Sequence, residues 1–126
     1  MAIREVIEIS GSSHKNPIPT AVKVNNMVFT SAVMGTHPET GKIPETIEEE
    51  TDLLFNYLEE IVEKAGGSTE NIAHLSVLIT DESYKKQLNT AWLTMFPDPS
   101  NRPARHTSVQ SLKPGMHIQI EMTAVL

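Results

Sequence analysis

The segment from Pro44 to Ala65 constrains the fold most strongly, because its apolar residues recur at helical spacing. They form one stripe along a predicted helix: Ile47, Leu53, Leu54, Tyr57, Leu58, Ile61, Val62 and Ala65. The acidic residues Glu45 and Glu48–Glu50 suit the positive end of the helix dipole, and Gly66-Gly67 provides a stop. We interpret the acidic run as a solvated helix face rather than a metal site. The apolar stripe has to pack against another layer.

Short β-favouring segments precede this helix. Ile3–Ile9 is a weak strand candidate, and Gly11–Pro19 is a loop rich in Gly, Ser, Asn and Pro. Ala21–Val24 and Met27–Ser31 flank Asn25-Asn26, and this pair suits a two-residue hairpin turn because Asn tolerates a left-handed φ. The N-terminal part of the chain therefore predicts up to three strands.

Strands and one more helix follow. Ala73, Leu75, Val77 and Ile79 share the buried face of a predicted strand. Asp81 or Ser83 can cap a second helix, which Pro97 and Pro99 end. Its apolar stripe is Tyr84, Leu88, Ala91, Trp92 and Met95. In the last alternation one face holds Ile118, Ile120, Met122 and Ala124, and the other holds His117, Gln119, Glu121 and Thr123.

The order β-β-β-α-β-α-β-β predicts one α+β domain, residues 1–126, with two helices packed on one face of a mixed sheet. The other face then needs cover. Because Gln119 and Glu121 lie on it, we expect that face to line a subunit interface or a cleft.

Composition excludes several classes of function. The net charge of -6 argues against nucleic acid, which needs a basic footprint. With no Cys, disulfides and thiolate catalysis are excluded. The start of the chain has no long apolar run, so we expect no secretory signal, no membrane span and a cytoplasmic location.

The segment Met34–Lys42 looks like a phosphate loop only superficially. Five residues separate Gly35 from Gly41 where that motif has four, and Ile43 stands where Ser or Thr would hold the metal. We therefore reject a nucleotide site here.

The segment Asn101–Val109 is the candidate site. Pro103 fixes its own φ and biases Arg102 toward an extended conformation, so Arg105 is predicted at the start of a strand. A guanidinium on such a rigid element can bind a carboxylate through two parallel hydrogen bonds. The alternative is a surface Arg in a solvated ion pair.

Several short motifs occur in order with short gaps: Asn26-Met27-Val28-Phe29-Thr30-Ser31, His37-Pro38-Glu39-Thr40-Gly41, Ala65-Gly66-Gly67, Val77-Leu78-Ile79-Thr80-Asp81, Pro103-Ala104-Arg105 and Ile118-Gln119-Ile120-Glu121. Together they resemble the Rid/YjgF family of reactive intermediate (enamine/imine) deaminases, over nearly the whole chain from about Asn16. The resemblance implies a chorismate-mutase-like fold and a homotrimer with clefts between subunits. It also implies hydrolysis of 2-aminoacrylate-type enamines and imines to 2-keto acids and ammonia, without metal or organic cofactor. The expected ligands are small carboxylate metabolites.

The resemblance assigns roles to individual residues. Arg105 matches the arginine that holds the substrate carboxylate, and Thr107 stands where deaminating members often have Cys beside the attacking water. Ser31 matches the serine of a Ser-Gly turn near the pocket, in which Ala32 replaces the glycine. Asn89 matches an asparagine that borders the cleft.

Two further departures concern the pocket and the proton. Ile18 occupies the place of a pocket tyrosine, and Gln119 stands where a glutamate usually exchanges protons. A glutamine amide can orient water but cannot carry a proton near neutrality. Glu121, two residues along the same strand, matches a second glutamate. A register shift could bring it toward the cleft, although a buried sheet face disfavours such shifts.

Two histidines are candidates for the proton-transfer role that Gln119 cannot fill. His106 and His117 are possible replacement bases, since His titrates in the useful range, although His106 should face away from Arg105. The five His residues show no metal-ligand spacing.

The alternative to a deaminase is a non-catalytic carboxylate-binding member, a ligand sensor or regulatory partner that keeps Arg105 but lacks the proton-transfer group.

Overall fold

The structure is a computed structural model that describes residues 3–11 and 14–126. Residues 12 and 13 of the predicted loop Gly11–Pro19 lie outside the described residues, as do residues 1 and 2. The strands are β1 (Arg4–Ile7), β2 (Ala21–Val24), β3 (Met27–Thr30), β4 (Val33–Met34), β5 (Ile72–Ile79), β6 (Ala104–Val109) and β7 (Ile118–Val125). The helices are α1 (Ile47–Lys64) and α2 (Lys85–Met95), with short 3-10 helices η1 (Thr69–Asn71) and η2 (Glu82–Tyr84).

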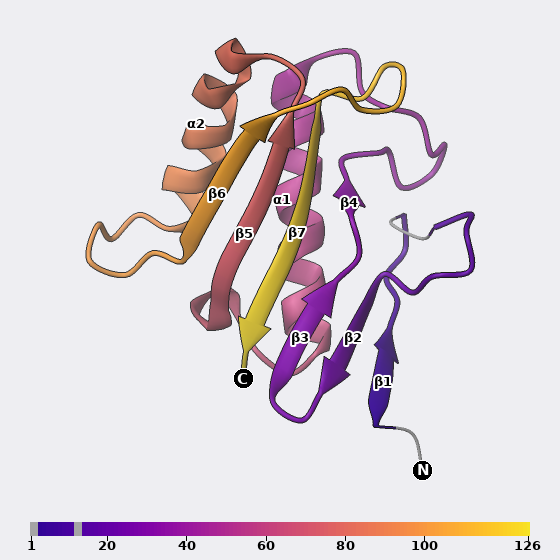
Figure 1. The fold of residues 1–126 in the computed structure, drawn as a ribbon, viewed down its shortest axis with the longest axis vertical. Coiled ribbons are helices and arrows are strands. Elements are labelled where there is room, and N and C mark those ends of the chain that lie inside the picture. The colour runs from indigo at the N-terminus through magenta and orange to yellow at the C-terminus, as the bar shows by residue number, and fades with distance from the viewer. Residues whose placement is uncertain (1–2, 12–13) are drawn as a thin grey trace.

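The strands form one mixed sheet in the order β1-β2-β3-β7-β5-β6, and β4 pairs with β7 beside β3 (Figure 1). β5 and β6 are parallel, whereas the other pairs are antiparallel. The predicted hairpin joins β2 to β3, and Asn25 has a φ of 54°, the left-handed conformation that the turn requires. The predicted element order is confirmed, with β4 as an addition that two residues were too few to signal.

Both helices lie on the same side of the sheet (Figure 1). Helix α1 begins at Ile47 because the Thr46 side chain accepts a hydrogen bond from the amide of Glu49, so Glu45 lies outside it. The predicted stripe of α1 is confirmed, with Phe55 and Thr51 also buried. The predicted stop is confirmed as well: Gly66 has a φ of 103°, a conformation that favours glycine.

The interpretation of the acidic run as a solvated face is wrong at one position. Glu48 and Glu49 are exposed, but Glu50 is 1% exposed and points into the protein. A 3.6-residue period brings one member of any three-residue run close to the apolar stripe. Glu50 therefore belongs to the interior, where its carboxylate has hydrogen-bond partners described below.

Strand β5 confirms three of its four predicted core residues. Leu75, Val77 and Ile79 are fully buried, but Ala73 is exposed and Ile72 is buried instead. A register irregularity between Ile72 and His74 explains this difference, because an extra residue in a strand reverses the alternation on one side of the bulge.

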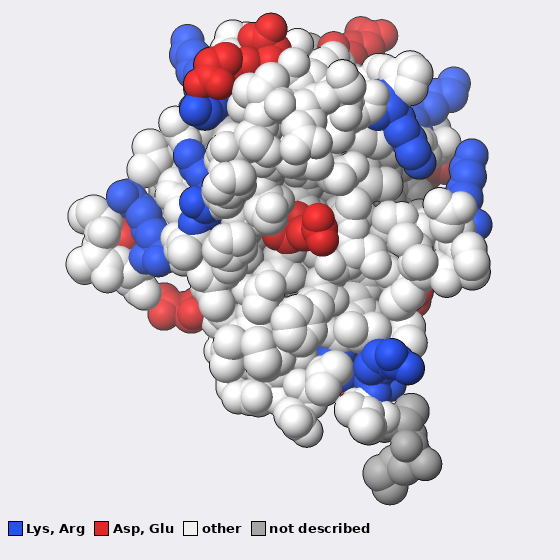
Figure 2. Space-filling model, viewed as in Figure 1, with Lys and Arg blue, Asp and Glu red and all other residues white. Residues whose placement is uncertain are grey.

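The sheet face opposite the helices carries apolar side chains that this single chain leaves exposed. Cross-strand pairing places Val6, Val22, Phe29 and Thr123 in one row of that face, and Met27 pairs with Val125 beside them. Val6 is 59% exposed and Phe29 is 40% exposed. Figure 2 shows this side of the molecule, with most Lys and Arg toward the rim and an acidic group near the centre. The sheet face opposite the helices is therefore more apolar than the polar residues Gln119 and Glu121 on it suggested.

Candidate functional site

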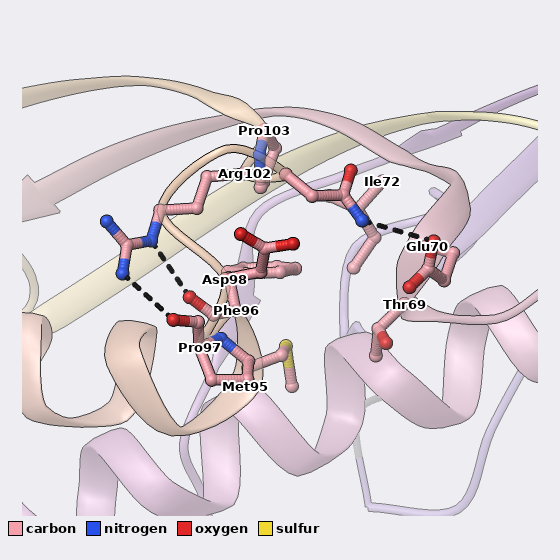
Figure 3. A pocket seen from close by; sticks show the side chains of 10 residues that line it. Thr69, Glu70, Ile72, Met95, Phe96, Pro97, Asp98, Arg102 and Pro103 are labelled. Atoms are coloured by element: carbon pink, nitrogen blue, oxygen red, sulfur yellow. Dashed lines mark hydrogen bonds between the residues drawn. The ribbon is translucent and has the colours of Figure 1, made fainter.

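The loop before β6 fixes where the candidate site begins. Arg102 Nε donates to the carbonyl of Phe96 at 2.9 Å, and its Nη2 donates to the carbonyl of Pro97 at 3.3 Å (Figure 3). Carbonyls at the end of a helix have no partner within it, so these bonds complete the end of α2. They also hold the short connection from α2 to β6 in one place. Arg102 is thus structural, and its guanidinium is engaged by the backbone.

A cavity of about 190 Å³ lies beside this connection, between the end of α2 and η1 (Figure 3). Glu70 and Asp98 line it, and Asn101 Nδ2 donates to Glu70 Oε2 at 3.3 Å. Asp98 accepts bonds from the amide and the hydroxyl of Ser100, which lower the pKa of its carboxyl below the ordinary value. Asn101, Arg102 and Pro103 of the candidate segment line this cavity, but none of the residues to which the family resemblance assigned a role does.

Arg105 is the second residue of β6, as the sequence predicted. It pairs with Leu75, and Leu75 is fully buried under the helices, so the Arg105 side chain lies on the helix side of the sheet. There Nη2 donates to Asn89 Oδ1 of α2 at 2.9 Å, and the guanidinium carbon is 4.8 Å from the Trp92 ring centroid. The structure therefore brings Arg105 and Asn89 together. Trp92, predicted only as a core residue of the second helix, also contacts Arg105.

The guanidinium of Arg105 is only partly satisfied. Its Nη1 atom is buried and has no hydrogen-bond partner among residues 3–11 and 14–126. Thr107 pairs with buried Val77 on the same side, and its hydroxyl oxygen is likewise buried without a partner in that part of the chain. Burial lowers the pKa of Arg105, because desolvation disfavours the charged form. A buried donor without a partner is costly, so an anion beside Arg105 would be favoured.

The remaining predicted residues lie elsewhere in the chain. Gln119 pairs with Leu78 of β5 and Met34 of β4, which places it on the face opposite Arg105. Glu121 is exposed on that same face, opposite Ser76. His106 also pairs with Ser76 and so faces away from Arg105, as predicted.

Ile18, Ser31 and Ala32 group with Gln119 rather than with Arg105. The Ser31 hydroxyl donates to the carbonyl of Pro19 at 2.8 Å, and its amide donates to Thr20. Ile18, next to Pro19, is 45% exposed. Ala32 leads directly into β4, which pairs with β7 at Gln119. Strands β7 and β5 lie between β3 and β6. Within one chain the residues around Gln119 are therefore separated from those around Arg105.

The sequence missed a pair between the buried Glu50 carboxylate and the half-buried His117 imidazole just before β7. Glu50 Oε1 lies 2.8 Å from His117 Nδ1, and the ring of His117 makes an edge contact with Tyr84 at 5.5 Å. The spacing carried the signal, since Glu50 lies three residues after Ile47 and four before Leu54 on the apolar stripe. Its partner His117 is distant in sequence, and a Glu is rarely fully buried unless it is paired. In the described residues no group of three or more His, Cys, Asp or Glu is placed to hold a metal ion.

The fold and these contacts define a small α+β domain with a partly satisfied guanidinium on its edge strand. The family model described as Endoribonuclease L-PSP matches residues 8–126. The chain belongs to this family, which is the Rid/YjgF family. The resemblance inferred from the short motifs is therefore confirmed.

Individual relatives agree with the family assignment. A RutC family protein of Aquifex aeolicus is 38% identical over 117 residues, or 88% of this chain and 94% of the relative. Reactive Intermediate Deaminase A of Arabidopsis thaliana is 35% identical over 112 residues, or 87% of this chain and 59% of the relative. The crystal structure of RidA from the Antarctic bacterium Psychrobacter sp. superposes with a TM-score of 0.89 at 29% identity, covering 98% of this chain and 100% of that one.

Proposed function

We propose that this protein hydrolyses small carboxylate-bearing enamines and imines, of the 2-aminoacrylate type, to 2-keto acids and ammonia. The carrying observation is the buried Nη1 of Arg105, which has no partner in the described chain, beside an Nη2 that Asn89 holds in place. A substrate carboxylate would satisfy that donor. Membership of a family with relatives named reactive intermediate deaminases supports the same chemistry.

The reaction needs water and proton transfer but no redox step. The enamine first takes a proton on carbon and becomes the imine. Water then adds to the imine carbon, the carbon–nitrogen bond breaks, and ammonia leaves as the ketone forms. Holding the carboxylate fixes the imine carbon relative to the water, and such orientation contributes several kcal/mol in favourable cases. In this proposal Arg105 binds the carboxylate and Thr107 lies beside the water.

The proposal includes a homotrimer with one site at each subunit interface. Arg105, Thr107 and Asn89 lie in one group, and Ile18, Ser31, Ala32 and Gln119 lie in another on the far side of β5 and β7. A second copy could supply the second group to the first. The exposed apolar face around Phe29 supports such an assembly, because removing apolar surface from water favours association.

Gln119 favours a second candidate function, that of a non-catalytic 2-keto-acid-binding protein acting as a ligand sensor or regulatory partner. The amide of Gln119 cannot transfer a proton, whereas Arg105 and its partner Asn89, which would bind the carboxylate, are both present. We place the deaminase first because the imine is itself labile toward water. An RNA-cleaving role, the activity in the family's description, is disfavoured by a net charge of -6.

Ammonia release from enzymatically generated 2-aminoacrylate tests the proposal. The native protein should accelerate release over buffer, and Arg105→Ala should abolish the acceleration. Arg102→Ala is an informative control, since Arg102 binds backbone carbonyls and should affect stability more than rate. If the native protein binds pyruvate but releases no more ammonia than buffer, the binding function replaces the deaminase.

A further inference from the structure

Residues of three loops line an open cavity of about 520 Å³, and none of the residues of the proposed deaminase site is among them. They are the described residues 11 and 14–16 after β1, the loop between β4 and α1, and the loop before β7. Figure 1 shows the loop between β4 and α1 leaving the end of β4. Ligand pockets commonly measure roughly 300–1,000 Å³, so this cavity could hold a small metabolite. Neither Arg105 nor Gln119 lines it.

The loops are tied to α1 and to one another. The Tyr57 hydroxyl of α1 donates to the carbonyl of Thr36, and the Thr36 hydroxyl donates to the carbonyl of Gly11 at 3.2 Å. Gly11 has a φ of 85°, and a Cβ there would lie 2.7 Å from Pro38, so only glycine fits this contact. The frame around the cavity is therefore built by specific contacts.

The loop before β7, which carries Lys113, is also held by specific contacts. A turn closes from Lys113 to Met116, whose amide donates to the Lys113 carbonyl at 3.0 Å. Gly115 has a φ of 84° and lies against Ile43 of the facing loop. Lys113 is thus carried by a short turn packed against the cavity wall.

The side chains that line the cavity have one sign of charge. The charged residues among them are Lys15 and Lys113, the imidazoles of His14 and His37 lie beside them, and no Asp or Glu is present among the described lining residues. This is unexpected in a chain with 16 acidic and 10 basic residues. Glu49 of α1 contacts His37 at 3.4 Å but does not line the cavity. Glu39, in the same loop as His37, does not line it either. A cluster of cations attracts anions and raises their local concentration.

One lining group carries an unmet hydrogen-bond requirement. His14 Nε2 is buried and has no partner within residues 3–11 and 14–126. Buried polar atoms are satisfied in the great majority of cases, and an exception points to a missing ligand or water. An imidazole nitrogen can donate to an anion oxygen.

We propose that this cavity binds the phosphate group of a small metabolite. Lys is a common phosphate ligand as a point charge, and donors converging from three loops suit a tetrahedral anion with several oxygens. The site is unlike a phosphate loop, because α1 begins only at Ile47, after the loop has passed the cavity. It would allow phosphorylated compounds to bind independently of a substrate at Arg105, so it does not depend on the proposed deaminase.

Calorimetric titration with pyrophosphate tests the site, with succinate as an anion that lacks phosphate. We expect pyrophosphate to bind and succinate to bind at least about tenfold more weakly. Lys15→Ala combined with Lys113→Ala should weaken pyrophosphate binding about tenfold or more, since both lysine charges that face the anion are removed. Both lysines are exposed, so the double variant should fold.

Two variants locate the binding. Lys86→Ala is matched in type, because Lys86 is also an exposed lysine beside a cavity, but that cavity is lined by Glu48 and Asp52. It should leave pyrophosphate binding unchanged, and so should Arg105→Ala. Absence of pyrophosphate binding, equal binding of succinate, or an equal loss in Lys86→Ala would overturn the assignment. Loss in Arg105→Ala alone would move the anion to the Arg105 group and also overturn it.

Discussion

Glu50 of α1 accepts hydrogen bonds from the backbone of β7 as well as from the side chain of His117. Its Oε2 accepts from the amide of His117 at 2.9 Å and from the amide of Ile118 at 3.3 Å, and its Oε1 lies 2.8 Å from His117 Nδ1. One buried carboxylate thus joins the first turn of the long helix to the strand that carries Gln119. This contact ties the start of β7 to α1.

The first prediction is that Glu50→Ala lowers the free energy of unfolding by about 3–5 kcal/mol, because it leaves buried donors without an acceptor. Glu50→Gln retains an acceptor oxygen and should cost only about 1–2 kcal/mol. Urea denaturation measures both. Glu49→Gln is the matched control on the exposed face and should change stability by less than about 0.5 kcal/mol. Equal losses for the Ala and Gln variants would show that the polar contacts are not the cause.

The second prediction concerns alkaline stability. Burial, and secondarily the charge of Glu60, raise the pKa of Tyr57 above its ordinary value. A raised folded-state pKa gives stability that is complete below the unfolded value near 10 and is lost as pH rises through the folded value. Tyr57→Phe should cost about 1 kcal/mol at neutral pH by removing the bond to Thr36. Its deficit should shrink above pH ~10, and a constant deficit up to pH ~11 would contradict the role of the phenol.

The third prediction is that Arg105→Lys weakens pyruvate or 2-oxobutanoate binding by roughly 1–3 kcal/mol. An ammonium cannot both bond to Asn89 and present a second fixed donor, as the guanidinium does. Calorimetry at fixed ionic strength gives the affinities. Arg102→Lys should leave them unchanged, because Arg102 is engaged by the carbonyls of Phe96 and Pro97. Equal affinity in the wild type and Arg105→Lys would remove Arg105 from the site.

The fourth prediction is that Gln119→Glu increases ammonia release from 2-aminoacrylate, because it adds a group that can transfer protons. General acid–base help from a positioned side chain is typically worth about 10²–10⁴-fold. Glu121→Gln is the complementary variant and should have little effect if Gln119 holds the proton-transfer position. A Gln119→Glu protein that folds and binds 2-keto acids normally but gains no rate would refute this placement.

The fifth prediction tests assembly. Light scattering in dilute neutral buffer should give the mass of a trimer, and Phe29→Glu should reduce it to that of a monomer by placing a charge on the exposed sheet face. Leu93→Glu is the control, since Leu93 is 51% exposed on α2 and away from that face. A monomer mass for the wild type would contradict the trimer and, with it, a site shared between subunits.

The sequence alone determined the elements and the family. The period of Leu54, Leu58 and Ile61 and the alternation through Ile118 and Ile120 reflect local geometry, since side-chain direction follows from the backbone period. The position of Arg105 at the start of a strand was predictable for a similar reason, because Pro103 restricts the chain just before it. The hydrogen-bond partners of Glu50 and the bulge that exposes Ala73 were not predictable, because they depend on the strand packed beside each residue.

The tertiary structure decided which predicted site residues meet. Arg105 and Asn89 are 16 positions apart in sequence and are joined because α2 packs over β6, whereas Arg105 and Gln119 lie on opposite faces of one sheet. It also decided that Lys15, His37 and Lys113, from three separate loops, line one cavity. Sequence patterns specify the direction of a side chain relative to its own element. Which elements become neighbours is set by burial of the whole apolar surface, a property of the complete chain.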